Sequence, residues 1–236
     1  MAKNTKKKSN SKKDTKKNVD MVTHVAIVLD RSGSMSRFHK QAVDGINEQF
    51  SLLRKNGSLA GKTTVSLLQF DDVIDTVFDG AESKDLPEWG YDDFKPRGGT
   101  AMNDAIWKSI NHLKAKPRTE NTAYLICVIS DGEENSSKEV TQDIIANEIE
   151  KLNATGEWTF TYILGGITAQ EELRFADKYK VSVSNIAAYN CTPISYAAGT
   201  STLSESMVDY LGARSVGDKS KSNLFSNEQK IALRNS

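Results

Sequence analysis

The chain has 236 residues, of which 38% are hydrophobic and 26% are charged, an ordinary composition for a globular protein. This length suffices for one α/β domain of about 200 residues with a tail and is marginal for two domains. No apolar run approaches the roughly 18 residues that span a bilayer, and the lysine-rich start is not followed by the apolar segment of a secretory signal. We therefore expect a cytoplasmic protein with no membrane partner.

The formal net charge of zero hides an uneven distribution of charge. Residues 1–18 carry eight lysines and one aspartate, a net charge of +7, so the remainder carries −7. Because this segment has almost no apolar side chains to bury, we expect residues 1–20 to form a disordered arm. Such an arm either holds nucleic acid or another polyanion, or serves as a solubilising tail, and the sequence leaves both open.

From residue 23 onward, strand-like and helix-like stretches alternate. Short apolar runs predict strands, and apolar residues at helical spacing predict helices. Asp71 and Asp72 join two of the strands and are predicted to be the turn residues of a hairpin. The predicted strands span residues 23–29, 63–70, 73–78, 122–130, 157–166 and 183–189, and the predicted helices span residues 39–54, 101–115, 138–153, 168–180 and 202–214.

This alternation indicates parallel βαβ units, and the hairpin adds one antiparallel edge strand. We predict an α/β, doubly wound (Rossmann-like) fold: a six-stranded, mostly parallel sheet with helices on both faces. The predicted domain covers residues 21–214, and residues 215–236 are predicted to be a loose, polar C-terminal tail.

Polar side chains follow two of the predicted strands and precede one of the helices. Asp30, Ser32 and Ser34 come after the first strand, Asp131 follows the fourth, and Thr100 stands behind two glycines before the helix at residue 101. Ligand sites of such sheets lie outside the carboxyl ends of the strands, so we expect these five residues in one crevice. Their hard oxygen atoms suit Mg²⁺, Mn²⁺ or Ca²⁺. Because the hydroxyls are neutral, the ion would keep positive charge for a further carboxylate from a partner.

Each of these residues also has an ordinary structural interpretation when it is taken alone. Ser32 and Ser34 are suited to capping a following helix, Asp131 to capping a turn, and Thr100 to the N-cap of the next helix. These separate roles do not explain why all five polar groups fall at one edge of the predicted sheet.

Three segments resemble the motifs of von Willebrand factor A (vWA) domains. Asp30–Ser34 (DRSGS) resembles the family's D-x-S-x-S motif, and Gly99-Thr100 resembles the loop that carries its threonine. Ser130–Gly132 resembles its T-D-G segment, with Ser in place of Thr. The similarity covers residues 22–212 in order and spacing and implies a vWA fold with a complete metal-ion-dependent adhesion site (MIDAS).

The resemblance also implies a role for each residue around an ion, which would be Mg²⁺ or else Mn²⁺ or Ca²⁺. Ser32 and Ser34 would bind it directly, and Asp30 would hold it mainly through water. Thr100 would bind it in the ligand-bound arrangement, and Asp131 directly or through water.

The implied function is that of a binding module whose metal captures an Asp or Glu of a protein partner. The lysine-rich arm and the absence of a secretory signal resemble intracellular bacterial or phage members, some of which work with AAA+ ATPases. A metal-dependent hydrolase or phosphoryl-transfer enzyme and a nucleic-acid scaffold that uses the arm are the alternatives. We do not expect an enzyme, because no His or Lys base lies near these motifs and no P-loop is present.

Neighbouring loop residues are further candidates for partner contacts. Glu133, Glu134 and Asn135 follow Asp131 on the same rim and are either contact residues or solvated loop residues. Arg and aromatic residues are favoured at interfaces, although a tryptophan can equally pack beneath its own loop. The candidates of that kind in loops expected to flank the metal are Arg37, Trp89 and Tyr91.

Overall fold

The computed structural model of the chain describes residues 21–57, 61–219 and 221–236. The predicted arm of residues 1–20 lies outside the described residues. In the described part of the chain, no helix is long and apolar enough to cross a membrane.

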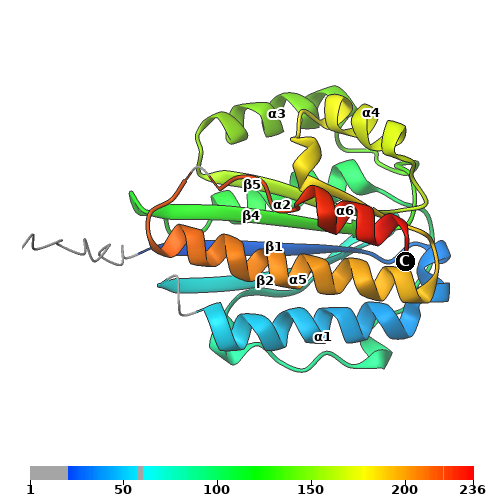
Figure 1. The fold of residues 1–236 in the computed structure, drawn as a ribbon, viewed down its shortest axis with the longest axis horizontal. Coiled ribbons are helices and arrows are strands. Elements are labelled where there is room, and N and C mark those ends of the chain that lie inside the picture. Colours follow the sequence, from blue (N-terminus) through cyan, green and yellow to red (C-terminus); the bar gives the residue numbers. More distant parts are fainter. Residues whose placement is uncertain (1–20, 58–60, 220) are drawn as a thin grey trace, which may run out of the picture.

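The described residues form one six-stranded sheet with the order β3-β2-β1-β4-β5-β6 (Figure 1). β3 pairs antiparallel with β2, and every other neighbouring pair is parallel. The predicted fold class is therefore confirmed, including the antiparallel edge strand. The strands are β1 (Val22–Asp30), β2 (Lys62–Phe70), β3 (Ile74–Glu82), β4 (Thr122–Ser130), β5 (Trp158–Gly165) and β6 (Ile186–Tyr189).

Helices cover both faces of the sheet (Figure 1). Alternate residues of the central strand β1 face opposite sides: Val25 and Ile27 join the core beneath α1 and α5, whereas Ala26 and Val28 join the core beneath α2 and α3. Burial on both faces explains why β1 is a nearly continuous apolar run. The helices are α1 (His39–Asn56), α2 (Met102–Lys114), α3 (Gln142–Ala154), α4 (Ala169–Tyr179), α5 (Pro193–Ser215) and α6 (Asn227–Arg234).

The C-terminal segment differs from the loose tail expected for residues 215–236. It contains α6, and Leu224, Phe225 and Leu233 are buried in the core shared with α1 and α5. The polar composition concealed this packing, because three apolar side chains anchor an otherwise hydrophilic segment. The helix before it, α5, also begins nine residues earlier than predicted, after the N-cap Thr192.

The order of the strands in the sheet determines where the candidate site lies. β1 lies between β2 and β4, so the chain proceeds to one side from β1 to β2 and later returns to the other side with β4. This change of direction is the topological switch point at which doubly wound folds bind ligands. In the parallel register Leu29 lies opposite Ile129, which brings the ends of β1 and β4 side by side.

Candidate functional site

The first part of the site forms where β1 ends at Asp30. Both carboxylate oxygens of Asp30 are hydrogen-bonded: Oδ1 accepts from the backbone N–H of Ser32 at 2.6 Å, and Oδ2 accepts from the hydroxyl of Ser130 at 2.5 Å. The chain then turns into a short 3-10 helix, η1 (Gly33–Phe38). Ser32 occupies its N-cap position, yet its side chain makes no capping hydrogen bond. Its hydroxyl oxygen instead lies 3.0 Å from that of Ser34.

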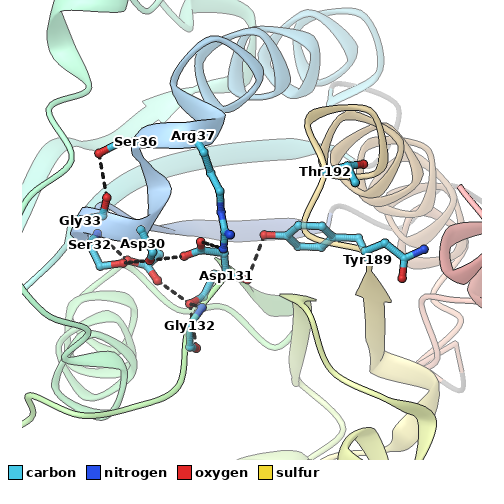
Figure 2. Close-up of polar contacts among 12 residues, drawn as sticks. Asp30, Ser32, Gly33, Ser36, Arg37, Asp131, Gly132, Tyr189 and Thr192 are labelled. Carbon is cyan, nitrogen blue, oxygen red and sulfur yellow. Dashed lines mark hydrogen bonds and ion pairs between the residues drawn. The ribbon is translucent and has the colours of Figure 1, made fainter.

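The second part comes from Asp131, directly after β4. The hydroxyl of Ser34 donates to Asp131 Oδ1 at 2.7 Å. Arg37 donates from Nη2 to Oδ2 at 2.7 Å (Figure 2). The carboxylate therefore faces η1 across the sheet edge and does not cap its own turn. Together these bonds link the D-x-S-x-S segment to the residue that follows β4.

Thr100 is held against the Asp131 loop by its backbone. Its N–H donates to Asn135 Oδ1 at 2.9 Å, and its carbonyl accepts from the Asn135 N–H at 3.0 Å. A Cβ built on Gly132 would lie 3.3 Å from Thr100 Oγ1 and 4.0 Å from Ser34 Oγ, so the two hydroxyls share one corner. Thr100 does not cap α2, because Ala101 occupies the N-cap position.

The two glycines before Thr100 allow this close approach. Gly98 has a φ of +66°, a conformation that side-chain-bearing residues rarely adopt, and a Cβ on Gly99 would overlap Ser136 Oγ. The Gly33 N–H donates to the Gly98 carbonyl at 3.1 Å, which ties the loop to η1. The structure thus brings all five predicted residues together.

The electrostatics of this cluster are unusual because both carboxylate side chains are buried. Asp30 is 0% exposed, and burial raises its pKa to about 6, although hydrogen bonds from Ser130 and Ser32 act in the opposite direction. The nearby charge of Asp131 raises the pKa of Asp30 further. A cation placed among these oxygens would offset the cost of burying two negative charges.

The donor set fits a hard divalent cation. It combines two carboxylates with three hydroxyls, and the described residues contain no group of three or more His, Cys, Asp or Glu side chains arranged to hold a metal. A metal site here would therefore depend on hydroxyl ligands, which suit Mg²⁺, Mn²⁺ or Ca²⁺ better than softer ions. The residues that would hold the ion are Asp30, Ser32, Ser34, Thr100 and Asp131.

Two acidic residues, Glu134 in the loop after β4 and Asp104 on α2, hold this loop in place, a role that the sequence did not reveal. Glu134 is half-buried, and its carboxylate accepts from the backbone N–H groups of Asn103, Ser136 and Ser137. Asp104 likewise accepts from the backbone N–H groups of residues 138–140. These two acids fasten the Asp131 loop to α2, while Glu133 is exposed.

Of the three further candidates for partner contacts, one contacts a site residue and two do not. Arg37 contacts Asp131, whereas Trp89 is buried and packs against Phe94, beneath its own loop. Tyr91 is exposed and donates a hydrogen bond to Asp44.

Asp71 and Asp72 lie in the turn between β2 and β3, as predicted. Asp71 has a further role, because it forms ion pairs with Arg31 at 2.8 Å and with Arg97 at 2.9 Å. These ion pairs connect the start of the D-x-S-x-S segment to the loop that carries Thr100.

A cleft of about 480 Å³ opens beside Asp131, between the ends of β4 and β5 and the helix α4. Its lining includes Asp131, Gly132, Gly166, Phe175 and Tyr179. The candidate site therefore has an adjoining recess large enough for side chains of a bound segment.

A doubly wound sheet with a polar site at its switch point defines a class of α/β ligand-binding folds. Within that class, the chain shares its fold with solved structures of von Willebrand factor type A proteins. Residues 25–134 match the family model described as von Willebrand factor type A domain, and this segment contains all five site residues. No curated protein matches the sequence.

Solved structures support the same fold. A von Willebrand factor type A protein from Catenulispora acidiphila aligns with a TM-score of 0.56 and 15% identity, covering 82% of this chain and 43% of that one. The vWF domain of the pili tip protein Mfa5 from Porphyromonas gingivalis aligns with a TM-score of 0.59 and 13% identity, covering 82% and 97%.

Proximal thread matrix protein 1 from the mussel byssus, described with a zinc-occupied MIDAS motif, aligns with a TM-score of 0.55 and 18% identity. The alignment covers 82% of this chain and 46% of that one. The chain thus spans less than half the length of the mussel and Catenulispora structures.

Proposed function

We propose that this protein is a metal-dependent binding module in which a bound divalent cation captures an acidic side chain of a partner protein. Asp30, Ser32, Ser34, Thr100 and Asp131 would hold the ion, and Mg²⁺ is the ion we expect, with Mn²⁺ or Ca²⁺ as substitutes. The ion would supply an electrophilic coordination position, and the protein residues would orient it toward the open rim.

The observation that carries the proposal is that two separate chain segments, those of Ser34 and Thr100, converge on the segment that contains Asp131. Ser34 bonds to its carboxylate, and the Thr100 hydroxyl lies beside the following Gly132. Hydroxyls that were needed only as helix caps would not gather around two buried carboxylates. The zinc-occupied MIDAS motif of the mussel protein adds support for a divalent ion at such a site.

An enzymatic function is less well supported by the surroundings of the site. Hydrolysis or phosphoryl transfer would need a proton acceptor close to the reacting water or hydroxyl. The three histidines, which would be natural bases, bond to groups outside the five-residue site: His24 to Thr64, His39 to the Phe94 carbonyl and His112 to Ser66.

The finer assignments follow from the sequence resemblance. We place the protein in the cytoplasm of a bacterium or in a phage assembly, with an AAA+ ATPase as a candidate partner. Nucleic-acid binding through residues 1–20 stays a prediction. Because Leu224 and Leu233 join the core, we extend the proposed vWA domain from residues 21–214 to the C-terminal helix.

The test compares Mg²⁺ binding by calorimetry for the wild type, Ser34→Ala and Ser36→Ala. Ser36 is a matched control, because it lies on the same 3-10 helix but donates to the Gly33 carbonyl at 2.7 Å, away from the site (Figure 2). We expect Ser34→Ala to weaken Mg²⁺ binding at least about tenfold, as the loss of a ligand should, while Ser36→Ala retains it.

Partner capture is the second measurement. Immobilised wild-type protein should retain its partner in Mg²⁺ and release it in EDTA, and Asp30→Ala should not retain it although circular dichroism shows a folded protein. Retention of the partner in excess EDTA would refute a metal-bridged contact. Turnover of a phosphate ester or peptide that is lost in Asp30→Ala would favour an enzyme instead.

A further inference from the structure

Arg37 places a positive charge directly on one of the proposed metal ligands. Its Nη2 atom lies 2.7 Å from Asp131 Oδ2 (Figure 2). The Arg37 side chain is 49% exposed, whereas that of Asp131 is 0% exposed. The positively charged guanidinium group at the solvent rim therefore reaches inward to a buried carboxylate oxygen.

Both oxygens of Asp131 are already bonded within the protein. Ser34 donates to Oδ1 and Arg37 donates to Oδ2, so neither carboxylate oxygen is free. Arg37 must leave Oδ2 before that oxygen can serve as a metal ligand or accept from a metal-bound water. The same charge that stabilises the buried carboxylate thus opposes loading of the site.

The contact is built so that it can be exchanged. One guanidinium nitrogen reaches Asp131, in place of the two parallel bonds of a bidentate pair, and the Arg37 side chain is half exposed, so water is available to replace the carboxylate as its partner. The guanidinium also lies over the Phe38 ring at 4.8 Å, and Phe38 stacks on Tyr196 with ring centroids 4.9 Å apart. The aromatic pair fixes a platform from which Arg37 can turn outward.

Two other arginines at this edge of the sheet have different partners. Arg31 is buried and pairs with Asp71 and Asp75, and Arg97 also pairs with Asp71. Neither carboxylate belongs to the proposed ligand set. Among the ion pairs of the described residues, the one between Arg37 and Asp131 is the one that involves a proposed ligand.

We infer that Arg37 is a built-in counter-ion of Asp131 that competes with the divalent cation for Oδ2 and is released to the rim when the site is loaded. This inference rests on the proposed metal site and adds a control on its loading. Arg37 lowers the affinity for the ion, and its release leaves a guanidinium beside the position where an acidic partner would bind.

The first test measures Mg²⁺ binding by calorimetry for the wild type, Arg37→Gln and Lys40→Gln. We expect Arg37→Gln to bind Mg²⁺ about two- to fivefold more tightly, the range of a half-exposed ion pair. Lys40→Gln is the matched control, because it removes a positive charge three residues after Arg37 that pairs with Asp44 and not with Asp131, and it should bind as the wild type does. Equal or weaker binding by Arg37→Gln would overturn the inference.

The second test follows the guanidinium itself by NMR. The Nε–Hε signal of Arg37, identified by its loss in Arg37→Gln, should shift when wild-type protein in EDTA is transferred to saturating Mg²⁺. The signal of Arg54, which donates to the Leu86 carbonyl away from the site, should not shift. An Arg37 signal that does not move refutes its release. If neither wild type nor Arg37→Gln binds Mg²⁺, the metal site itself is refuted, whereas equal affinities refute only the role of Arg37.

Discussion

Burial of Asp30 makes a prediction about stability that does not require a partner. Its carboxyl pKa is about 6 in the folded protein, against 3.8 for the unperturbed group, chiefly because of burial. The folded protein therefore holds this proton more tightly than the unfolded chain. The resulting stability is present below pH 4 and is lost as the pH rises through 6.

The size of the effect follows from the two pKa values. A shift from 3.8 to about 6, at 1.36 kcal/mol per unit, makes ionisation of Asp30 in the folded state cost about 3 kcal/mol. Between pH 5 and pH 7 the linked change in the free energy of unfolding is about 1.3 kcal/mol. Histidines also titrate in this window, so the effect must be isolated by comparison with a variant.

Asp30→Asn provides that comparison. The amide can still accept from the Ser32 N–H, and the Ser130 hydroxyl, which lies 3.2 Å from the Gly132 carbonyl, has another acceptor once the carboxylate is gone. Urea unfolding in EDTA should show that the wild type loses about 1.3 kcal/mol more than Asp30→Asn between pH 5 and pH 7. At pH 7 the variant should be the more stable protein.

Addition of Mg²⁺ at pH 7 should make the wild type more stable than Asp30→Asn. Binding to the folded state alone stabilises a protein by about 2.7 kcal/mol at a ligand concentration of one hundred times Kd. The wild type should gain this stability, and Asp30→Asn should gain little. Parallel pH profiles in EDTA would show that Asp30 is not an unusually costly buried charge and would refute the electrostatic argument for a cation site.

Two further predictions concern residues outside the ligand set. Asn135→Ala removes the side-chain acceptor of the Thr100 N–H, so the affinity for Mg²⁺ measured by calorimetry should fall about tenfold while the protein stays folded. Unchanged affinity would show that Asn135 does not position Thr100. Glu172→Gln removes the buried carboxylate that pairs with Lys230 and Arg234 of α6, which should cost about 3 kcal/mol in urea unfolding. The exposed Asp177→Asn on the same helix is its control and should change stability by less than about 0.5 kcal/mol.

The parts of the fold that the sequence predicted are those with a strong periodic signal. β1 and β4 are apolar along nearly their whole length because both of their faces are buried, and this makes them recognisable. The C-terminal segment carries no such period, because α6 packs through a few apolar side chains and through ion pairs with Glu172. Such an element depends on partners far away in the chain.

The candidate ligands were predictable because each one directly follows a strand or precedes a helix, and the sheet topology then places those ends together. The supporting contacts were not predictable in this way. The bond between Ser130 and Asp30 joins residues 100 positions apart, and the bond between Arg37 and Asp131 spans 94. Their partners are set by the paired ends of β1 and β4, and no local pattern marks them.

The charges of the site suggest why an arginine should stand beside a metal centre. Asp30 and Asp131 together would formally balance a divalent cation, so an acidic side chain would be attracted by the open coordination position of the ion alone. Arg37 adds one positive charge at the half-exposed rim, so the loaded site would carry a net charge of +1. Neutral hydroxyl ligands keep that surplus, whereas a third carboxylate would cancel it. Competition for Asp131 and attraction of an acidic partner are therefore two consequences of the same charge, and Arg37 would weaken the first binding step while favouring the second.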